Sequence, residues 1–168
     1  PETTAQVLRE GWLHTGDIGR FDQDGYLQIT DRKKDIIVNS GGDNISPQRI
    51  EGLLTLEPEI AQAMVHGDRR PHLVALIVPD EEFAKGWAAA NQIPFSMDGL
   101  AGNPGFHKAI LTALDRVNKG LSNIERIRRF LLVPEPFTVA NEMMTPTLKI
   151  RRHVIRKNWG DRLEALYE

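Results

Sequence analysis

The stretch DRKKDIIVNSGGDNISPQRIE, residues 31–51, constrains the fold more than any other part of the sequence. It carries a charged run, a short apolar run, the turn formers Asn39 to Asn44, and then Ser46 and Pro47, which are typical of a helix start. Adjacent glycines in so short a turn indicate either positive φ angles or a place where a side chain would block an approaching group. We therefore predict a strand, a tight turn and a helix over residues 34–56.

The rest of the chain interleaves strand and helix patterns without repeats. Asp24-Gly25 predicts a hairpin over residues 17–32, and residues 60–68 and 72–80 are typical of antiparallel strands. Helices are expected over 1–11, 81–92, 104–120, 122–129 and 150–167, and a further strand over 130–139. Interleaved elements around a small sheet predict an α+β fold, in which a short, mostly antiparallel sheet is packed by helices.

The composition excludes several classes of protein. The 168 residues carry a net charge of -2, which argues against binding to nucleic acid. Cysteine is absent, so neither a disulfide framework nor a thiolate zinc site is expected, and the five histidines have no metal-ligand spacing. We find neither a signal peptide nor a membrane-spanning run, so we expect a cytoplasmic protein. Because the chain starts at Pro1 without a methionine, we expect it to be a piece of a longer protein.

Three groups of residues carry chemistry that a binding site needs, and each also has a plainer explanation. Asp17 can accept two hydrogen bonds from a vicinal diol such as a ribose, or form an Asx turn. Gly41 and Gly42 would leave bare backbone for a passing ligand, or merely serve the turn. Lys149, in TPTLKIRR, offers a flexible cation to a phosphate or carboxylate, or belongs to a solvated helix start with the guanidinium groups of residues 151–152 on the surface. Taken singly, Asp17 and Lys149 favour the plainer explanation.

The three groups occur together and in one order. The block GWLHTGDIGRFDQDGYLQITDRKKDIIVNSGGDNISPQRIE is followed about a hundred residues later by TPTLKIRR. Over essentially the whole chain, this combination resembles the C-terminal end of the AMP-forming acyl-CoA synthetases of the adenylate-forming superfamily. The Thr-Pro-Thr-x-Lys pattern, with Leu148 where many relatives have glycine, resembles the long-chain fatty-acid branch. The resemblance implies an acid–thiol ligase of lipid metabolism, which converts fatty acid and ATP to acyl-AMP and pyrophosphate, and then uses CoA to give acyl-CoA and AMP.

The resemblance also implies roles for individual residues. Asp17 matches the acidic residue that holds both ribose hydroxyls of ATP, and Arg32 matches an arginine that contacts the same ribose. Lys149 matches the catalytic lysine that bridges the substrate carboxylate and the α-phosphate. Gly41 and Gly42 match the turn along which the pantetheine arm of CoA passes once the domain has rotated.

A domain organisation follows from the same resemblance. Residues 1–30 would be the last β-hairpin of a large N-terminal domain, and residues 31–168 would be a small mobile C-terminal domain, with its hinge at 31–34 and its pivot at Lys34. The chain has no Ser/Thr/Gly-rich phosphate loop and no long apolar pocket segment. The ATP phosphates, a magnesium ion, the acyl tail and any peripheral membrane contact are therefore assigned to the missing part. We expect this chain alone to fold but not to catalyse.

Three alternatives stay open. A fatty-acyl-AMP ligase would pass its product to a carrier protein instead of CoA, and would keep Asp17 and Lys149. A peptide-synthetase adenylation domain fits less well, because such a chain should continue into a carrier domain beyond Glu168. A non-catalytic binding module with a degenerate site is disfavoured, because Asp17, Arg32 and Lys149 are all present. The acyl chain length and the oligomeric state are left open.

Overall fold

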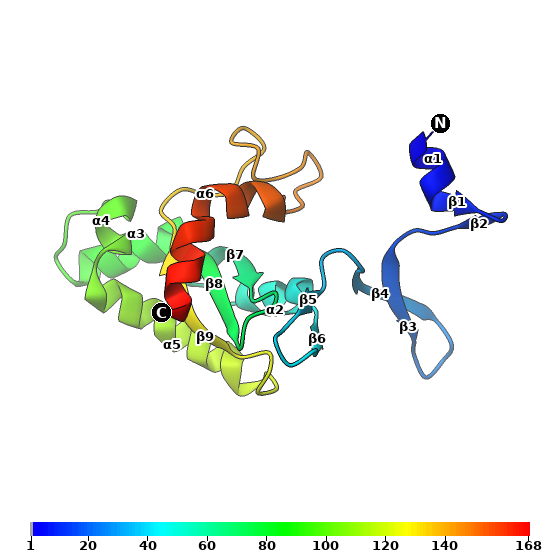
Figure 1. Cartoon of the computed structure of the whole chain (residues 1–168). Helices are drawn as coiled ribbons and strands as arrows, with labels where there is room; N and C mark the ends of the chain where they lie inside the picture. The colour runs from blue at the N-terminus through cyan, green and yellow to red at the C-terminus, as the bar shows by residue number, and fades with distance from the viewer. Residues whose placement is uncertain (1) are drawn as a thin grey trace. The chain divides into compact units, whose positions relative to one another are not determined.

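The computed structural model describes residues 2–168. Internal contacts divide the chain into two units, Pro1–Ile36 and Ile37–Glu168. Both units contain helix and short antiparallel strands (Figure 1), so the predicted α+β class with mostly antiparallel pairing is confirmed. Within the described residues, no helix is both long enough and apolar enough to cross a membrane.

The first unit consists of a short helix followed by two hairpins. After α1 (Glu2–Val7), β1 (Leu8–Arg9) pairs with β2 (Trp12–Leu13), and β3 (Asp17–Phe21) pairs with β4 (Leu27–Arg32). Both pairs are antiparallel, and the second is the hairpin that Asp24-Gly25 predicts. The hairpin predicted over residues 17–32 is therefore confirmed.

The helix predicted over residues 1–11 is wrong in its second half. α1 ends at Val7, and Glu10 and Gly11 take positive φ angles of 52° and 79°, which turn the chain back on itself. The turn lets Leu8 pair with Leu13, so the chain gains a strand pair where the helix would have continued. Pro1, expected in the first helical turn, lies outside the described residues.

A three-stranded sheet in the order β7–β8–β9 forms the centre of the second unit. β7 (Ile60–His66) runs antiparallel to β8 (Leu73–Pro79), as predicted, whereas β9 (Ile127–Leu132) runs parallel to β8. A parallel neighbour requires a long crossover connection. The crossover consists of α3 (Glu81–Ala90), α4 (Met97–Ala101) and α5 (Pro104–Lys119).

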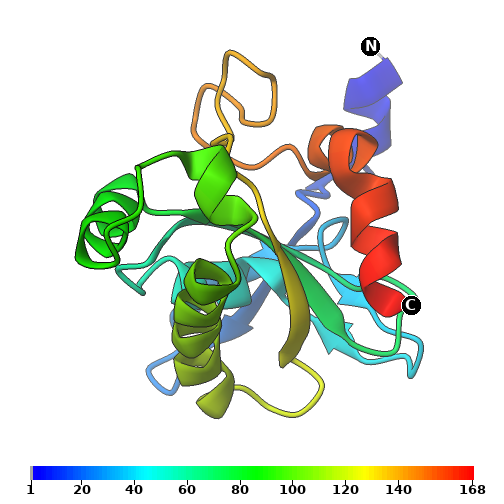
Figure 2. The ribbon, with the colours of Figure 1, turned by 90° about the vertical axis from the view of Figure 1, so that its left-hand side faces the viewer.

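Both faces of this sheet are covered. Ala75 and Ile77 of β8 pack into a cluster with α2 (Pro47–Leu54), α3 and α5, while Leu76 and Val78 pack into a second cluster with α6 (Arg152–Glu164). Figure 2 shows α5 and α6 on opposite sides of the sheet. All seven residues of β8 are buried, which accounts for its unbroken apolar sequence. The second unit therefore has an apolar interior of its own. The chain ends in a short 3₁₀ helix, η1 (Ala165–Tyr167).

The helix predicted over residues 122–129 is wrong. The capping-box contact is present, because the N–H and Oγ of Ser122 both donate to Glu125 Oε2, at 3.2 and 2.6 Å. However, the chain enters β9 at Ile127, so this contact closes only a turn. The strand predicted over 130–139 consequently begins three residues earlier and ends at Leu132, and the last helix begins at Arg152.

Candidate active-site elements

The glycine turn, residues 39–44, connects β5 (Ile37–Val38) to β6 (Asn44–Ile45). Asn39 organises it, because its Oδ1 accepts hydrogen bonds from the N–H groups of Gly41 and Asp43, both at 2.9 Å. Gly42 has a φ of +85°, and a Cβ on it would meet no atom within 4 Å. The turn therefore needs glycine at position 42 for its backbone conformation, and it has open space beside that position.

The glycine turn rests on the connection between β7 and β8. The Ser40 N–H donates to the carbonyl of Arg70 at 3.0 Å, and the Arg69 N–H donates to the carbonyl of Val38 at 2.7 Å. The Val38 N–H in turn donates to the Asp68 carboxylate at 3.2 Å. Through these contacts the turn is fixed to one end of the central sheet.

The lysine loop, residues 144–150, is a second tight turn. An isolated bridge joins Met144 to Ile150, and the Thr145 N–H donates to the Lys149 carbonyl at 2.8 Å. The Lys149 N–H donates to Thr145 Oγ1 at 3.1 Å. Leu148 takes a φ of 57° and is 70% exposed, and Lys149 is also exposed. The loop therefore holds the backbone of Lys149 at both polar groups while its ammonium reaches solvent.

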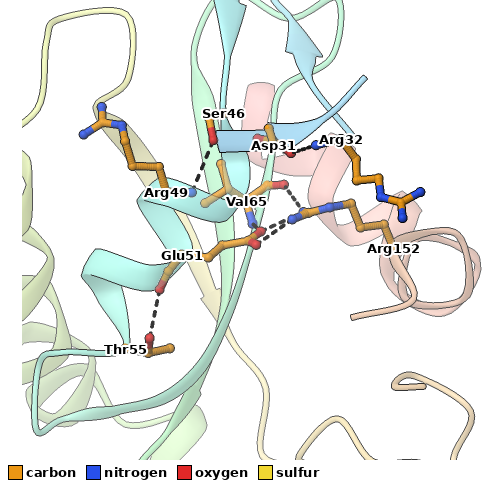
Figure 3. A network of polar contacts seen from close by, with 8 residues as sticks. All are labelled: Asp31, Arg32, Ser46, Arg49, Glu51, Thr55, Val65 and Arg152. Atoms are coloured by element: carbon orange, nitrogen blue, oxygen red, sulfur yellow. Dashed lines mark hydrogen bonds and ion pairs between the residues drawn. The ribbon is translucent and has the colours of Figure 1, made fainter. Parts of the chain in front are cut away.

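A buried ion pair holds the start of α6, directly after the lysine loop. Arg152 Nη1 and Nη2 donate to Oε1 and Oε2 of Glu51 at 2.7 and 2.5 Å (Figure 3). The two side chains are 19% and 9% exposed. The expectation that residues 151–152 keep their guanidinium groups on the surface is therefore wrong for Arg152, because a bidentate carboxylate partner offsets much of the cost of burial.

In the first unit, Asp17 and Arg32 face each other in the ladder between β3 and β4. Arg32 Nε donates to Asp17 Oδ1 at 2.8 Å, and both side chains keep contact with solvent. A carboxylate beside a guanidinium suits a vicinal diol, because the carboxylate accepts from hydroxyl groups and the guanidinium donates to them. The structure thus brings together the two residues that the sequence predicts for ribose binding.

Lys34 lies exposed in the turn that follows β4. The N–H groups of Asp35 and Ile36 donate to the Arg32 carbonyl at 2.9 and 3.2 Å, which closes this turn. The division of the chain by internal contacts falls after Ile36. The pivot at Lys34, the hinge at 31–34 and a domain boundary after residue 30 stay predictions.

A polar cluster lies at the end of β7, beside the connection that supports the glycine turn. His66 is buried, and its Nε2 is 3.2 Å from Glu164 Oε1. Burial lowers the pKa of His66 below its ordinary value of 6.5, although the hydrogen bond to the Glu164 carboxylate opposes the shift. Arg70 also pairs with Glu164, and the Tyr167 hydroxyl is 3.2 Å from the carbonyls of His66 and His72. Burial raises the pKa of the Tyr167 hydroxyl.

Residues 2–168 contain no group of three or more His, Asp or Glu side chains that could hold a metal ion.

A family model described as the AMP-binding enzyme C-terminal domain matches residues 34–168. The match includes both the glycine turn and the lysine loop. The chain belongs to this family. The family assignment agrees with the resemblance that the sequence motifs carry.

Named relatives of this AMP-binding enzyme C-terminal domain are much longer proteins. A long-chain-fatty-acid–CoA ligase of Mycobacterium tuberculosis is 39% identical over 168 residues, which cover 99% of this chain and 28% of the relative. Long-chain-fatty-acid–CoA ligase 5 of Rattus norvegicus is 40% identical over 172 residues, which cover 100% of this chain and 25% of the relative. The chain spans about a quarter of the length of these curated relatives.

Two of the solved structures with the same fold contain adenylation domains of carboxylic acid reductases. The adenylation domain of a carboxylate reductase from Mycobacterium chelonae has a TM-score of 0.84 and 30% identity, covering 99% of this chain and 25% of that one. The A-PCP didomain of a carboxylic acid reductase from Segniliparus rugosus, in complex with AMP, has a TM-score of 0.81 and 29% identity, covering 99% and 22%.

Three residues that shape these elements were not predicted from the sequence. Asn39 had a usable signal, because an Asn at the start of a glycine-containing turn commonly bonds to the backbone two residues on. Thr145 and Glu51 had none of comparable strength. Glu51 binds a partner 101 residues away, and no local pattern specifies such a pair.

Proposed function

We propose that this chain is the C-terminal part of an AMP-forming long-chain fatty-acid–CoA ligase, which is active as the complete protein. Membership of the AMP-binding enzyme C-terminal domain family supports the reaction class, and identities of 39% and 40% to long-chain ligases support the substrate class. The observation that carries the proposal is the exposed Lys149 on a loop whose backbone is held at both ends.

In the first half-reaction, an oxygen of the fatty-acid carboxylate attacks the α-phosphorus of ATP, and pyrophosphate leaves. Both reactants are negatively charged, so a cation between them lowers the barrier as charge gathers on the phosphoryl oxygens. We assign this role to the Lys149 ammonium. Its flexible stem and exposed position allow it to enter a site formed by another part of the complete protein.

In the second half-reaction, the sulfur of CoA attacks the carbonyl carbon of acyl-AMP, the thiol proton is lost, and AMP leaves. We assign the path of the pantetheine arm to Gly41 and Gly42. Open space beside Gly42 supports this assignment, because a thin ligand arm can run along backbone that carries no side chain there. A rotation about the region 31–34, with Lys34 as pivot, would exchange the lysine loop for the glycine turn at the reaction centre.

Asp17 and Arg32 are assigned to the ribose of ATP. The 2.8 Å contact between them supports this, because it orients the carboxylate for a diol. The first unit also exposes Trp12, Phe21 and Tyr26 to 76%, 73% and 72%, and large apolar side chains exposed to this extent suit contact with further protein. We propose that they contact the large domain that holds the ATP phosphates, magnesium, the acyl tail and any membrane contact.

A second candidate function is transfer of the acyl group to a carrier protein. It is favoured by the similarity to carboxylic acid reductase adenylation domains, one of which was solved as an A-PCP didomain. The two candidates share the first half-reaction and differ only in the carrier of the pantetheine thiol. The exchange of CoA for a phosphopantetheinylated carrier protein in the assay separates them.

The test is an assay of the complete enzyme with ATP, CoA and saturated fatty acids of increasing chain length. Pyrophosphate, AMP and acyl-CoA should form in equal amounts, with the highest kcat/KM for long chains. Formation of ADP and phosphate, or turnover without a fatty acid, would contradict the proposed reaction. The 168-residue chain alone should fold but give no ATP–pyrophosphate exchange.

A further inference from the structure

We propose that Glu51 and Arg152 are positioning residues for Lys149, and this inference rests on the proposed function. Neither side chain lies on the lysine loop, and neither is exposed enough to serve as the mobile cation or its partner. They join α2 to the first residue of α6, which lies three residues after Lys149. The pair therefore sets the position of the C-terminal end of the lysine loop relative to α2.

The connection from Arg152 to the lysine loop is short and stiff. The Arg151 N–H donates to the Met143 carbonyl at 2.8 Å, and the next contact along the chain is the bridge between Ile150 and Met144. Met143 is itself buried in the core cluster on the α6 side of the sheet. The two residues that join Arg152 to the lysine loop are thus both held by main-chain contacts with residues 143 and 144.

The Glu51 end of the pair is fixed to the central sheet. Glu51 Oε1 accepts a hydrogen bond from the Val65 N–H at 2.7 Å, and Arg152 Nη1 lies 3.3 Å from the Val65 carbonyl. Figure 3 shows the guanidinium of Arg152 directed at the Glu51 carboxylate, whereas the side chain of Arg49, which like Glu51 is on α2, is directed away from it. Glu51 and Arg152 therefore fix the start of α6, which follows the lysine loop, relative to β7.

α2, the helix that contains Glu51, also lies close in sequence to the glycine turn. α2 begins directly after β6, with Ser46 as its N-cap, and β6 is the strand that closes the glycine turn. One ion pair consequently links the element that follows the glycine turn to the element that follows the lysine loop. The glycine turn is also held by its own contacts with residues 68–70, so we expect loss of the pair to affect the lysine loop and not the glycine turn.

A buried ion pair is weak evidence for stability, because its desolvation cost is similar to its Coulomb gain. What a bidentate arginine–carboxylate pair does supply is orientation, since two parallel hydrogen bonds fix the planes of both groups. Catalysis needs such orientation, because a displacement of about 1 Å can cost as much as a hundredfold in rate.

Arg152→Lys in the complete enzyme tests the inference, because it keeps the charge and removes the bidentate geometry. The kcat of ATP–pyrophosphate exchange should fall about ten- to a hundredfold. Thioester formation from supplied acyl-adenylate should stay within about twofold, since that step does not use Lys149. Amide hydrogen exchange at Thr145 and Lys149 should become faster, which reports the loosened loop without reference to activity.

Arg116→Lys is the matched control. Arg116, on α5, donates from Nε to Glu57 Oε2 at 2.8 Å and from Nη2 to Glu59 Oε1 at 2.7 Å, and it has no part in the lysine loop. It should change neither half-reaction nor the amide exchange of residues 145 and 149. Glu51→Gln is the second variant, in case Arg152→Lys does not fold, because it removes the charge and keeps an acceptor for the Val65 N–H.

Lys149→Ala, measured in parallel, separates failure of the inference from failure of the proposed function. If Lys149→Ala leaves pyrophosphate exchange intact, the role assigned to Lys149 is wrong, and amide exchange alone then decides whether the pair positions the loop. If Lys149→Ala abolishes exchange while folded Arg152→Lys and Glu51→Gln enzymes lose both half-reactions equally, or lose neither, the positioning role is overturned.

Discussion

The glycine turn and the lysine loop are both short, exposed turns with one residue in the left-handed region, yet they are held in different ways. Asn39 binds the N–H groups of Gly41 and Asp43 within the glycine turn itself. Thr145 closes the lysine loop in a similar way, but the helix that follows the loop is held by Arg152, whose partner Glu51 lies 101 residues away in sequence. The glycine turn is placed by main-chain and Asp68 contacts with residues 68–70, whereas the placement that we propose for the lysine loop uses a side-chain ion pair between distant segments.

The two turns should therefore be sensitive to mutation at different places. A turn that is organised locally fails when its own residues change. A loop that is placed by distant contacts fails also when those contacts change, even though its own sequence is intact. Each turn contains a residue with positive φ, Gly42 at +85° in the glycine turn and Leu148 at 57° in the lysine loop. Substitutions at these two residues therefore compare the two turns at the same kind of backbone site.

The largest expected effect follows removal of the Lys149 ammonium. In the complete enzyme, Lys149→Ala should lower the rate of acyl-adenylate formation about a hundred- to a thousandfold, because in the proposed role it removes a charge that stabilises the transition state. ATP–pyrophosphate exchange measures this rate. Lys157→Ala, which removes another exposed lysine of the second unit, is the control and should leave exchange near the unmodified rate.

A smaller effect is expected at Gly42, and it should appear in the other half-reaction. Gly42→Leu should lower thioester formation by about tenfold or more while acyl-adenylate formation persists, because the side chain would occupy the open space assigned to the pantetheine arm. Gly42→Asn separates the two reasons for glycine, since Asn tolerates positive φ. If Gly42→Asn supports CoA transfer at the unmodified rate, glycine is needed for backbone conformation alone.

The sequence predicts the glycine turn better than the lysine loop for the same physical reason. Turn formers, Ser46 as a cap and Pro47 at the helix start are local signals, and the predicted strand, turn and helix are present. The pairing of β9 beside β8 and the burial of Arg152 depend on contacts between distant segments. The helix predicted over 122–129 was wrong because the capping signal of Ser122 and Glu125 carries no information on the strand that follows.

The support beneath the glycine turn should depend on pH. The pKa of His66 is lowered in the folded state, so the unfolded chain binds a proton first as the pH falls below about 6.5, and stability is lost as the pH falls through the lowered folded pKa. The groups that face His66 are Glu164, Arg156 and Asp68. For one proton the slope is at most about 1.4 kcal/mol per pH unit.

Thermal unfolding of the 168-residue chain between pH 7.5 and 5 measures this slope. His66→Gln should reduce the slope. The part of the slope due to His72 should remain, because the pKa of His72 is lowered mainly by burial and to a smaller extent by the charge of Arg129. An unchanged slope in His66→Gln would show that His66 does not contribute to the pH dependence of stability. Amide exchange should respond at Ser40 before it responds at Lys149, because the polar cluster lies beside the support of the glycine turn.

The smallest expected effect is at Leu148. Leu148→Gly removes the strain of positive φ and little burial, since the side chain is 70% exposed, but it also adds freedom to the unfolded chain. We expect the free energy of unfolding to change by less than about 1 kcal/mol, and acyl-adenylate formation to stay within a few-fold. A loss as large as that of Lys149→Ala would mean that Leu148 itself contacts the substrate.

If one unit serves both half-reactions through two different turns, mutations in the two turns should separate the two activities. Pyrophosphate exchange and acyl-CoA formation from supplied acyl-adenylate are therefore measured on the same preparations of Lys149→Ala and Gly42→Leu. We expect a crossed result, in which Lys149→Ala loses only the first activity and Gly42→Leu loses only the second. Equal loss of both activities in either folded variant would show that the two turns do not serve separate half-reactions.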